Sequence, residues 1–419
     1  MSTLWHGFAD MHGVAANELV IHSGRGVVIT DITGREYLDA TASLWYCNVG
    51  FGRAEIAERV ASQLERLPAY SNFGAFATDT TVELADRLAA LSPMPDTVVF
   101  LGSGGSDAVD TAAKLARRYW DVMGQPERRV IVSREHSYHG MHGWGTSLAG
   151  IPGNKAGYGG AFIDEVVQVG VADTEALGAL FEERGGEIAA FIGEPVIGAG
   201  GVIPPEPHYW AEVNRLCREH DILLIADEVI TGFGRVGEWF GSIRYEIQPD
   251  MITFAKGVSS GYVPIGGVLV GQRVRAPFWD EPVPGAVFRH GYTYGGHAAG
   301  AAAALANLDI IDREDLIGRV RQLTPILDRA VRRLETAPLV GEIRTVGLTA
   351  AVTLRPDLVA ADPTLADKVA AASIRHGVAT RSLRGHAIQL SPAFVISEAE
   401  LDAIIDGFSR ALDDVSAAR

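Results

Sequence analysis

The chain has 419 residues, of which 47% are hydrophobic and 21% are charged, and its formal net charge at pH 7 is -16. A chain of this length and composition folds into one large domain with a smaller one beside it, which excludes a disordered or fibrous protein. Because acidic residues predominate and no run of Lys and Arg exceeds two, the charge argues against nucleic acid or an anionic membrane surface as a partner.

Cysteine use and the N-terminal residues bear on the cellular compartment. The two cysteines, Cys47 and Cys217, lie far apart in the sequence and form no CxxC pair, which fits a reducing environment. The first residues, MSTLWHGFADMHG, have no basic start followed by an apolar core, and no apolar run is long enough to span a membrane. We therefore expect a cytoplasmic protein without a membrane partner.

In chain order, residues 20–40 predict short strands around Gly-containing turns, which indicates a small antiparallel unit. From about Glu55 onward, strands alternate with amphipathic helices, a pattern typical of a parallel sheet covered on both faces. The expected helices are 55–67, 80–91, 107–120, 209–220 and 297–312, and the expected strands are 97–101, 130–133, 189–193 and 222–226. This alternation predicts an α/β large domain.

The C-terminal part predicts a second, α+β unit. Helices are expected at 317–334, 365–376 and 398–415, with strands at "GLTAAVTL" and "AIQLSP" between them. We expect this tail to pack with the N-terminal segment. The predicted division is therefore an N-terminal part of the small domain at 1–54, a large domain at 55–312, and a C-terminal part of the small domain at 313–419.

A Gly-rich turn joins an expected strand to an expected helix in "TVVFLGSGGSDAVDTAAKLARRYW", residues 97–120. With Ser106 as the expected N-cap, the backbone N–H groups at this helix start and the Ser106 hydroxyl predict an anion site, with phosphate as the expected ligand. The turn is not a dinucleotide fingerprint, because Asp107 stands where the last Gly of GxGxxG belongs, and no GK[ST] follows. A purely structural turn is the alternative.

An acid and an amine are expected at neighbouring strand ends. Asp227 and Glu228 follow the apolar run "ILLIA", and Lys256 ends another mostly apolar strand in "MITFAKG". Because sites in open α/β sheets lie at the carboxyl ends of the strands, Asp227 and Lys256 are expected to face one crevice. The alternatives are that Asp227 caps a turn or that the two form a structural ion pair.

The segment "REHSYHGMHG" raises the question of a metal site. His136, His139 and His142 are spaced by three residues, a spacing that suits neither HExxH nor a zinc finger. We therefore expect no metal ligand among them.

Six motifs then carry a resemblance that covers essentially the whole chain: "GSGGSDAVDTAAK", "HSYHG", "GEPVIGAGG", "LLIADEVITGFGR", "TFAKG" and "HGYTYGGH". In this order and spacing they resemble the class III pyridoxal-phosphate-dependent aminotransferases of fold type I, and "LWYCNVGFG" resembles the omega-amino acid or amine:pyruvate branch. The resemblance implies pyridoxal 5'-phosphate as cofactor. It also implies a large domain with a mixed, mostly parallel sheet flanked by helices, and a smaller α+β domain built from both termini.

The resemblance implies the central chemical roles of two residues. Lys256 matches the family's Schiff-base lysine, whose amine condenses with the cofactor aldehyde and later moves a proton on the substrate carbon. Its apolar setting suits this role, since burial lowers the pKa of a lysine. Asp227 matches the carboxylate that pairs with the pyridine nitrogen and keeps it protonated.

Further cofactor contacts are implied in the same way. Gly105 and Ser106 match the phosphate cradle, although Gly104, Asp107 and Val109 depart from the family's Ser-Gly-Ser-Glu-Ala-Asn. The remaining matches are Tyr138 and Val229 on the two ring faces, Glu194 near the cofactor, and Thr293 at the phosphate of the neighbouring subunit. The Thr293 match implies an obligate homodimer. Plain core packing is the alternative for Tyr138 and Val229, and backbone bonding at a turn is the alternative for Glu194.

Substrate residues follow from the resemblance less directly. Trp45 and Tyr46 match the aromatic wall of a small amine pocket, and Phe73 or Phe76 is a candidate second wall across the dimer; plain core packing is the alternative for each. The family's keto-acid Arg lies in Arg-Pro-x-Gly-Asp. Here "ATRSLRGHAIQLSP" fits Arg381 with one inserted residue, while Arg384 precedes Gly385 directly, so Arg381 is preferred and Arg384 remains open.

The implied function is transfer of an amino group from an amine or omega-amino acid to a keto acid, with pyruvate expected. One alternative on the same fold is a decarboxylase or aminomutase that uses the same Lys256 and Asp227. A second alternative, of another class, is a cofactor-binding regulatory protein without turnover. The sequence contains no basic module of the kind such a protein would use on DNA, which disfavours it.

Overall fold

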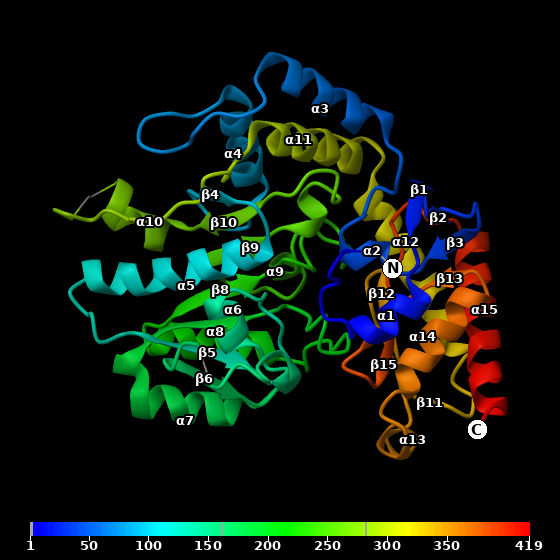
Figure 1. Ribbon diagram of the computed structural model, residues 1–419. Coiled ribbons are helices and arrows are strands. Elements are labelled where there is room, and N and C mark those ends of the chain that lie inside the picture. The colour runs from blue at the N-terminus through cyan, green and yellow to red at the C-terminus, as the bar shows by residue number, and fades with distance from the viewer. Residues whose placement is uncertain (1–2, 161, 281–282) are drawn as a thin grey trace.

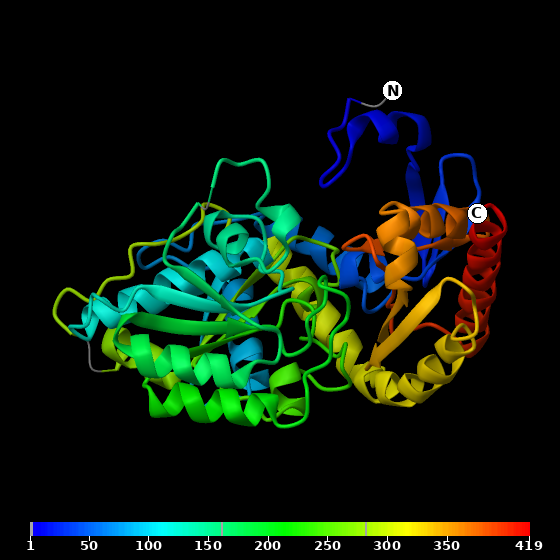
Figure 2. The ribbon, with the colours of Figure 1, turned by 90° about the horizontal axis from the view of Figure 1, so that it is seen from below.

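The computed structural model describes residues 3–160, 162–280 and 283–419, and it is built around a seven-stranded sheet (Figures 1 and 2). In spatial order this sheet contains β4 (Val98–Gly102), β10 (Gly266–Val270), β9 (Met251–Phe254), β8 (Leu223–Asp227), β7 (Ile188–Gly193), β5 (Val130–Arg134) and β6 (Val166–Val169). Neighbouring strands from β9 to β6 pair in parallel, and β10 pairs antiparallel with both β9 and β4. The predicted mixed, mostly parallel sheet is therefore confirmed.

Helices cover both faces of this sheet, because its strands are apolar on both sides. Side chains alternate along β8: Leu223 and Ile225 pack in a core cluster with α5 (Gly105–Val122), whereas Leu224 packs in another cluster with α7 (Thr174–Arg184) and α8 (Tyr209–Glu219). On the α7 and α8 side of the sheet, Ala226 and Ile252 join a third cluster with α4 (Asp79–Leu91) and the Ala-rich α11 (Ala298–Arg313). Short helices α6 (Gly143–Leu148), α9 (Gly241–Arg244) and α10 (Gln272–Trp279) complete this part.

The two ends of the chain form the second part, at the right of Figure 1. One sheet has the order β1 (Ile21–Arg25), β2 (Val28–Asp31), β3 (Glu36–Asp39) and β13 (Val378–Ala379); the other has β11 (Val340–Val346), β12 (Thr349–Leu354), β15 (Ala387–Leu390) and β14 (Ser382–Leu383). Its helices are α1 (Met11–Asn17), α2 (Ala42–Trp45), α12 (Leu316–Arg332), α13 (Pro356–Ala361), α14 (Leu365–Arg375) and α15 (Glu398–Ala417). Because β13 pairs in parallel with β3, the C-terminal tail packs with the N-terminal segment, as predicted.

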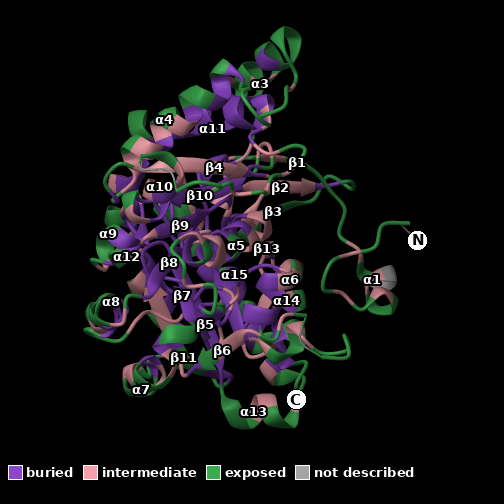
Figure 3. Cartoon of the chain, turned by 90° about the vertical axis from the view of Figure 1, so that its left-hand side faces the viewer, coloured by how far each residue is buried: buried purple, intermediate pink, exposed green. Residues whose placement is uncertain are grey.

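The division into domains at residues 54 and 312 remains our proposal. It is supported by the strands, since every strand of the seven-stranded sheet lies between residues 98 and 270, and the two smaller sheets use strands from outside this range. Figure 3 shows the buried residues gathered along the large sheet and α11, while the N-terminal segment with α1 stands apart and is largely exposed.

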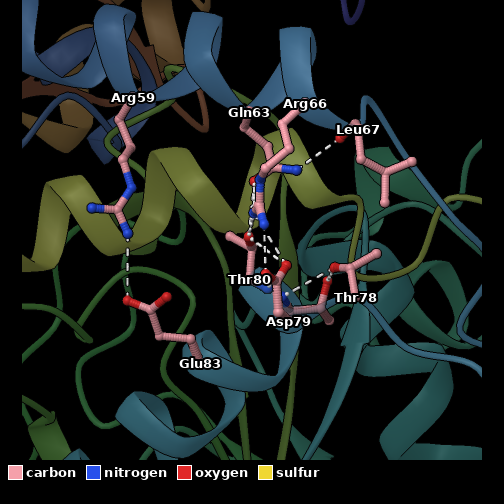
Figure 4. Close-up of polar contacts among 9 residues, drawn as sticks. Arg59, Gln63, Arg66, Leu67, Thr78, Asp79, Thr80 and Glu83 are labelled. Carbon is pink, nitrogen blue, oxygen red and sulfur yellow. Dashed lines mark hydrogen bonds and ion pairs between the residues drawn. The ribbon is translucent and has the colours of Figure 1, made fainter.

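Helix α3 (Ala54–Arg66) lies over α11 and is joined to α4 by polar contacts (Figure 4). The buried Gln63 donates from Nε2 to the carbonyl of Leu67 at 2.7 Å, and its Oε1 accepts from Thr80 Oγ1 at 2.8 Å. Arg66 of α3 also forms an ion pair with Asp79 of α4. These contacts close the base of the segment 67–78, which connects the two helices and carries the exposed side chains of Tyr70, Phe73 and Phe76.

The predicted start of α5 is wrong. Ser106 was expected to be the N-cap, but α5 begins at Gly105 with Gly104 as its N-cap, so Ser106 lies inside the first turn. The physical reason is that the Asp107 carboxylate accepts a hydrogen bond from Ser103 N–H at 2.7 Å, which closes the turn from within the helix. In the described ranges, no helix is both long and apolar enough to cross a membrane.

Candidate active site

A cavity of about 130 Å³ opens where β8 and β9 end and α5 begins. It brings together residues from five separate segments of the chain. The predicted cofactor residues that line it are Gly105, Ser106, Tyr138, Glu194, Asp227, Val229 and Lys256. The crevice expected at the carboxyl ends of the strands therefore exists, and it contains every predicted cofactor residue except Thr293.

Lys256 lies two residues beyond the end of β9, not at the end of the strand as predicted, and it opens a single 3-10 turn, η3 (Lys256–Val258), with φ 47°. Such a left-handed backbone is strained for a residue with a side chain, so neighbours must hold it. Asn307 of α11 does so: its Nδ2 donates to the carbonyls of Gly257 and Val258, both at 2.9 Å. Sequence reasoning missed Asn307, because a single Asn in an Ala-rich helix carries no signal of its partner.

Burial lowers the pKa of Lys256 from 10.5 to about 8, although the nearby carboxylates of Asp227 and Glu194 act in the opposite direction. The charged ammonium loses hydration inside the cavity, and the two carboxylates restore only part of that stabilisation. A larger fraction of Lys256 is therefore neutral near neutral pH than for an exposed lysine, and a neutral amine is the form that attacks a carbonyl carbon.

Asp227 is the last residue of β8, and only 3% of it is exposed. Its Oδ2 accepts from His139 Nδ1 at 2.7 Å, and its Oδ1 accepts from Thr253 Oγ1 at 3.0 Å and from Val229 N–H at 3.2 Å. These donors orient the carboxylate toward the cavity that Lys256 also lines. A structural ion pair between Asp227 and Lys256 would not by itself account for the cavity that both side chains line.

His139 is a functional candidate that the sequence reasoning missed. It was considered only as a metal ligand, whereas its ring is buried, lines the cavity and donates from Nδ1 to Asp227. Among the residues that the structure describes, its Nε2 has no hydrogen-bond partner. The motif "HSYHG" was the available signal, but spacing along the chain could not show which distant carboxylate the ring would meet. Within the described residues, no three His, Cys, Asp or Glu side chains gather as a metal site.

Glu194 follows β7 and is buried, and burial raises its pKa. Its Oε1 accepts from Tyr138 N–H and its Oε2 from Gly198 N–H, both at 2.9 Å. Glu194 therefore lines the cavity, and it also accepts hydrogen bonds from backbone N–H groups, which was the alternative role expected from the sequence. By holding the backbone of Tyr138, it determines where that aromatic ring meets the cavity.

The start of α5 forms the opposite end of the cavity, and close approach of backbone shapes it. A Cβ on Gly105 would lie 3.0 Å from a methyl of Val229, and a Cβ on Gly140 would lie 2.5 Å from Ser106 Oγ. Ser106 Oγ also accepts from Met141 N–H at 3.1 Å. Free N–H groups at the first turn of this 18-residue helix suit an anion.

A second cavity, of about 350 Å³, shares Tyr138, Ile230 and Lys256 with the first and extends toward the C-terminal part. It contains two of the predicted substrate residues, Trp45 and Arg381, and also the alternative Arg384. The Arg381 guanidinium lies 4.6 Å from the centre of the Trp45 ring, and its Nε donates to Gln389 Oε1 at 2.7 Å. Burial lowers the pKa of Arg381 to about 10, so it keeps its positive charge at neutral pH.

The remaining predicted residues line neither of these two cavities; they are Tyr46, Phe73, Phe76 and Thr293. Tyr46 accepts from Ser43 Oγ at 2.5 Å and packs against Gly261, where a Cβ would lie 2.3 Å from its ring. Phe73 and Phe76 line a third, separate cavity and are 52% and 60% exposed. Thr293 is exposed too. The substrate and dimer roles of these four residues stay predictions.

Among the residues that line the second cavity without having been predicted are Phe8, Leu44 and Ile230. Leu44 and Ile230 adjoin the predicted Trp45 and Val229 and lie inside the motifs LWYCNVGFG and LLIADEVITGFGR, so the sequence signal for both was already present. No sequence signal identifies Phe8, because it reaches the cavity only through the path of the N-terminal segment across the surface.

Comparisons with known proteins agree with this geometry. The sequence model of the family described as aminotransferase class-III matches residues 11–412. The putrescine–pyruvate aminotransferase of Pseudomonas aeruginosa is 38% identical over 95% of this chain and 91% of that protein, and the beta-alanine–pyruvate aminotransferase of the same organism is 33% identical over 98% and 96%. A solved structure of the omega transaminase from Pseudomonas jessenii in complex with PMP is 34% identical, with a TM-score of 0.94 over 99% of this chain and 97% of that one.

Proposed function

The chain belongs to the class-III aminotransferases, which use pyridoxal 5'-phosphate, and from this we propose that it transfers an amino group from an amine or omega-amino acid to pyruvate. The observation that carries the proposal is the pair of joined cavities, since Lys256 is shared by the cavity of Asp227 and the cavity of Arg381. Relatives named as aminotransferases disfavour the decarboxylase and aminomutase alternatives.

The donors and acceptors of the first cavity fit the cofactor. A buried carboxylate, Asp227, suits a protonated ring nitrogen, and the free N–H groups at the start of α5 suit a phosphate. Lys256 suits an aldehyde. We propose that Val229 and Tyr138 hold the two ring faces, and that Gly105 and Ser106 hold the phosphate. When bound, the cofactor withdraws electrons from the substrate carbon that bears the amine.

The residues of this chain then supply the proton chemistry and the orientation. Lys256 Nζ, with its pKa lowered to about 8, would carry a proton from the amine-bearing carbon of the donor to C4′ of the cofactor in the first half of the cycle, and from C4′ to the former carbonyl carbon of the keto acid in the second half. Asp227 keeps its negative charge directed into the cavity, because His139 and Thr253 donate to its two oxygens. Glu194 positions Tyr138 through the backbone N–H of that residue.

We propose that Arg381 binds the carboxylate of pyruvate. It lines the same cavity as Lys256 and carries a guanidinium that suits a planar carboxylate. The contact with the Trp45 ring holds the guanidinium while leaving N–H groups for the substrate. Trp45, with its Nε1 bonded to Ser391 Oγ at 3.0 Å, forms a fixed aromatic wall for the apolar part of the amine.

We further propose a homodimer in which Thr293, Phe73 and Phe76 serve the site of the neighbouring subunit. The support is that these side chains are exposed and lie away from the cavity of their own chain. We also propose a cytoplasmic location, supported by two free, buried thiols, Cys47 and Cys217, that form no disulfide.

The direct test supplies the purified protein with pyridoxal 5'-phosphate, a panel of amines and omega-amino acids, and pyruvate, and measures alanine. Alanine is expected from at least one donor, and none is expected from Lys256→Ala. Arg381→Met is expected to keep the first half of the reaction, release of the oxidised donor, while losing pyruvate use. Carbon dioxide release or an internal shift of the amine, without alanine from any donor, would overturn the proposal.

A further inference from the structure

A second guanidinium lines the cavity that contains Lys256 and Arg381. Arg384 lies in the turn between β14 and β15, with φ 49°, and its side chain reaches the cavity from the outer, exposed side. One of its N–H groups donates to the carbonyl of Gly200 at 3.3 Å. This single contact leaves most of the donors of Arg384 available to a ligand.

Two more basic side chains gather at the same place. Arg344 of β11 donates to the carbonyl of Gly201 at 3.4 Å. A Cβ built on Gly201 would lie 3.6 Å from Arg344 Nη1 and 3.7 Å from His386 Nε2, so both groups face the space that this glycine leaves open. We call Arg344, Arg384 and His386 the cationic rim.

Carboxylates neutralise little of the positive charge of the cationic rim. Glu342 pairs with Arg344, but Glu342 is 55% exposed, and water screens that contact. In the described part of the chain, no carboxylate lies within 4.0 Å of Arg384. Burial is the main cause that lowers the pKa of Arg384 and of His386, and the neighbouring guanidinium groups lower both pKa values further. Because its lowered pKa leaves the His386 ring neutral at pH 7, the positive charge of the rim comes from Arg384 and Arg344, in a chain of net charge -16.

Arg381 and Arg384 line the same cavity at different depths, whereas Arg344 and His386 lie beside Gly201 and do not line it themselves. Arg381 is partly buried, rests on Trp45 and acts electrostatically on Lys256, whereas Arg384 is exposed. A carboxylate bonded to the reacting carbon would meet Arg381. A carboxylate at the far end of an aliphatic chain would be carried outward instead, toward the rim.

We propose that the cationic rim binds the distal carboxylate of omega-amino acid substrates, while Arg381 binds the carboxylate of the keto acid. This inference rests on the proposed function and assigns residues to one class of its donors, those with an amine at one end of an aliphatic chain and a carboxylate at the other. Charge-assisted bonds from Arg to a carboxylate are strong and directional, which suits this selection.

The test compares two donors of equal length, 6-aminohexanoate and hexylamine, in the first half of the reaction without pyruvate. For Arg384→Met we expect kcat/KM for 6-aminohexanoate to fall about tenfold to hundredfold, because a hydrogen bond to a charged group is lost. Hexylamine carries no carboxylate, so we expect its value to change less than about threefold. Arg384→Lys keeps the charge and should recover part of the loss, and rising salt should weaken 6-aminohexanoate selectively.

A matched control is Arg355→Met, which removes another half-exposed arginine, paired with Asp357 away from the cavity, and should change neither donor. Equal losses for the two donors in Arg384→Met, or no loss for 6-aminohexanoate, would overturn the proposal. If the wild-type enzyme forms alanine from hexylamine and pyruvate while Arg384→Met leaves 6-aminohexanoate unchanged, only the rim fails. If no donor yields alanine, the proposed function itself fails.

Discussion

Lys256 combines a strained backbone, two residues beyond the end of the buried strand β9, with a pKa that burial lowers. Its ammonium form is destabilised by lost hydration, while Asp227 and Glu194 stabilise that form. The balance places the pKa at about 8, so the neutral amine becomes dominant as the pH rises through that value.

This balance predicts the pH dependence of Lys256 reactivity. In protein freed of cofactor, covalent capture of pyridoxal, made permanent with borohydride and measured by mass spectrometry, should rise with pH and level off above about pH 8. Asp227→Asn removes a charge that raises the pKa of Lys256, so its profile should shift to lower pH. Lys256→Ala is the control for capture at other lysines, and a wild-type midpoint near 10.5 would contradict the assignment.

At the residue scale, the sequence could predict groups that stand at strand ends within specific motifs. Lys256 and Asp227 are such groups, and the structure places both at one cavity. His139 and Asn307 could not be predicted in their observed roles, because each acts on a partner from a distant part of the chain. Which side chains meet across elements is decided by packing, and no spacing along the chain encodes it.

At the scale of elements, the contact between α3 and α4 shows which polar groups matter for stability. Gln63 is buried and satisfies both the carbonyl of Leu67 and the hydroxyl of Thr80. Arg59, on the same helix, makes only an exposed pair with Glu83 at 3.4 Å (Figure 4). We therefore expect Gln63 to contribute more to the free energy of unfolding than Arg59, because Gln63 is buried and the Arg59 pair is exposed.

We predict that Gln63→Leu lowers the free energy of unfolding by about 1 to 3 kcal/mol, since it removes two hydrogen bonds of the buried Gln63 amide, to the carbonyl of Leu67 and to the hydroxyl of Thr80, each of which contributes about 0.5 to 1.5 kcal/mol. Arg59→Ala should change it by less than about 0.5 kcal/mol. Denaturant unfolding of the holoenzyme measures both, and faster proteolysis of the segment 67–78 should accompany the first change. A loss from Arg59→Ala as large as that from Gln63→Leu would disprove this reading of the contact.

Element types along the chain followed from periodicity, whereas some boundaries did not. Amphipathic spacing predicted α8, α12, α14 and α15, because a helix with one buried face shows that face in its sequence. The start of α5 was misplaced because Gly104 and Asp107 together close its first turn, and a Ser motif suggested a different cap. The end of β9 was misplaced because apolar residues continue past the last strand bond.

At the scale of the whole molecule, both ends of the chain meet in one sheet through β3 and β13. The sequence could indicate that the ends pack together, but a two-residue strand such as β13 leaves no periodic signal to predict its pairing. In the proposed dimer, a second copy of the chain would cover the surface that carries the exposed Thr293, Phe73 and Phe76.

The dimer proposal predicts a particular result for mixed subunits. Thr293→Ala homodimers should bind cofactor about tenfold to hundredfold more weakly, because a hydroxyl bond to a phosphate is lost.

In a hybrid dimer of one Lys256→Ala subunit and one Thr293→Ala subunit, the intact Lys256 and the intact Thr293 belong to different chains. If Thr293 serves the neighbouring site, that site is complete, so the hybrid should show wild-type cofactor affinity at half the number of sites. If Thr293 acts within its own chain, the only site with Lys256 lacks it, and the hybrid should bind as weakly as the Thr293→Ala homodimer. Differently tagged subunits, co-expressed and purified by both tags, allow cofactor titration and alanine formation to be measured on the hybrid alone.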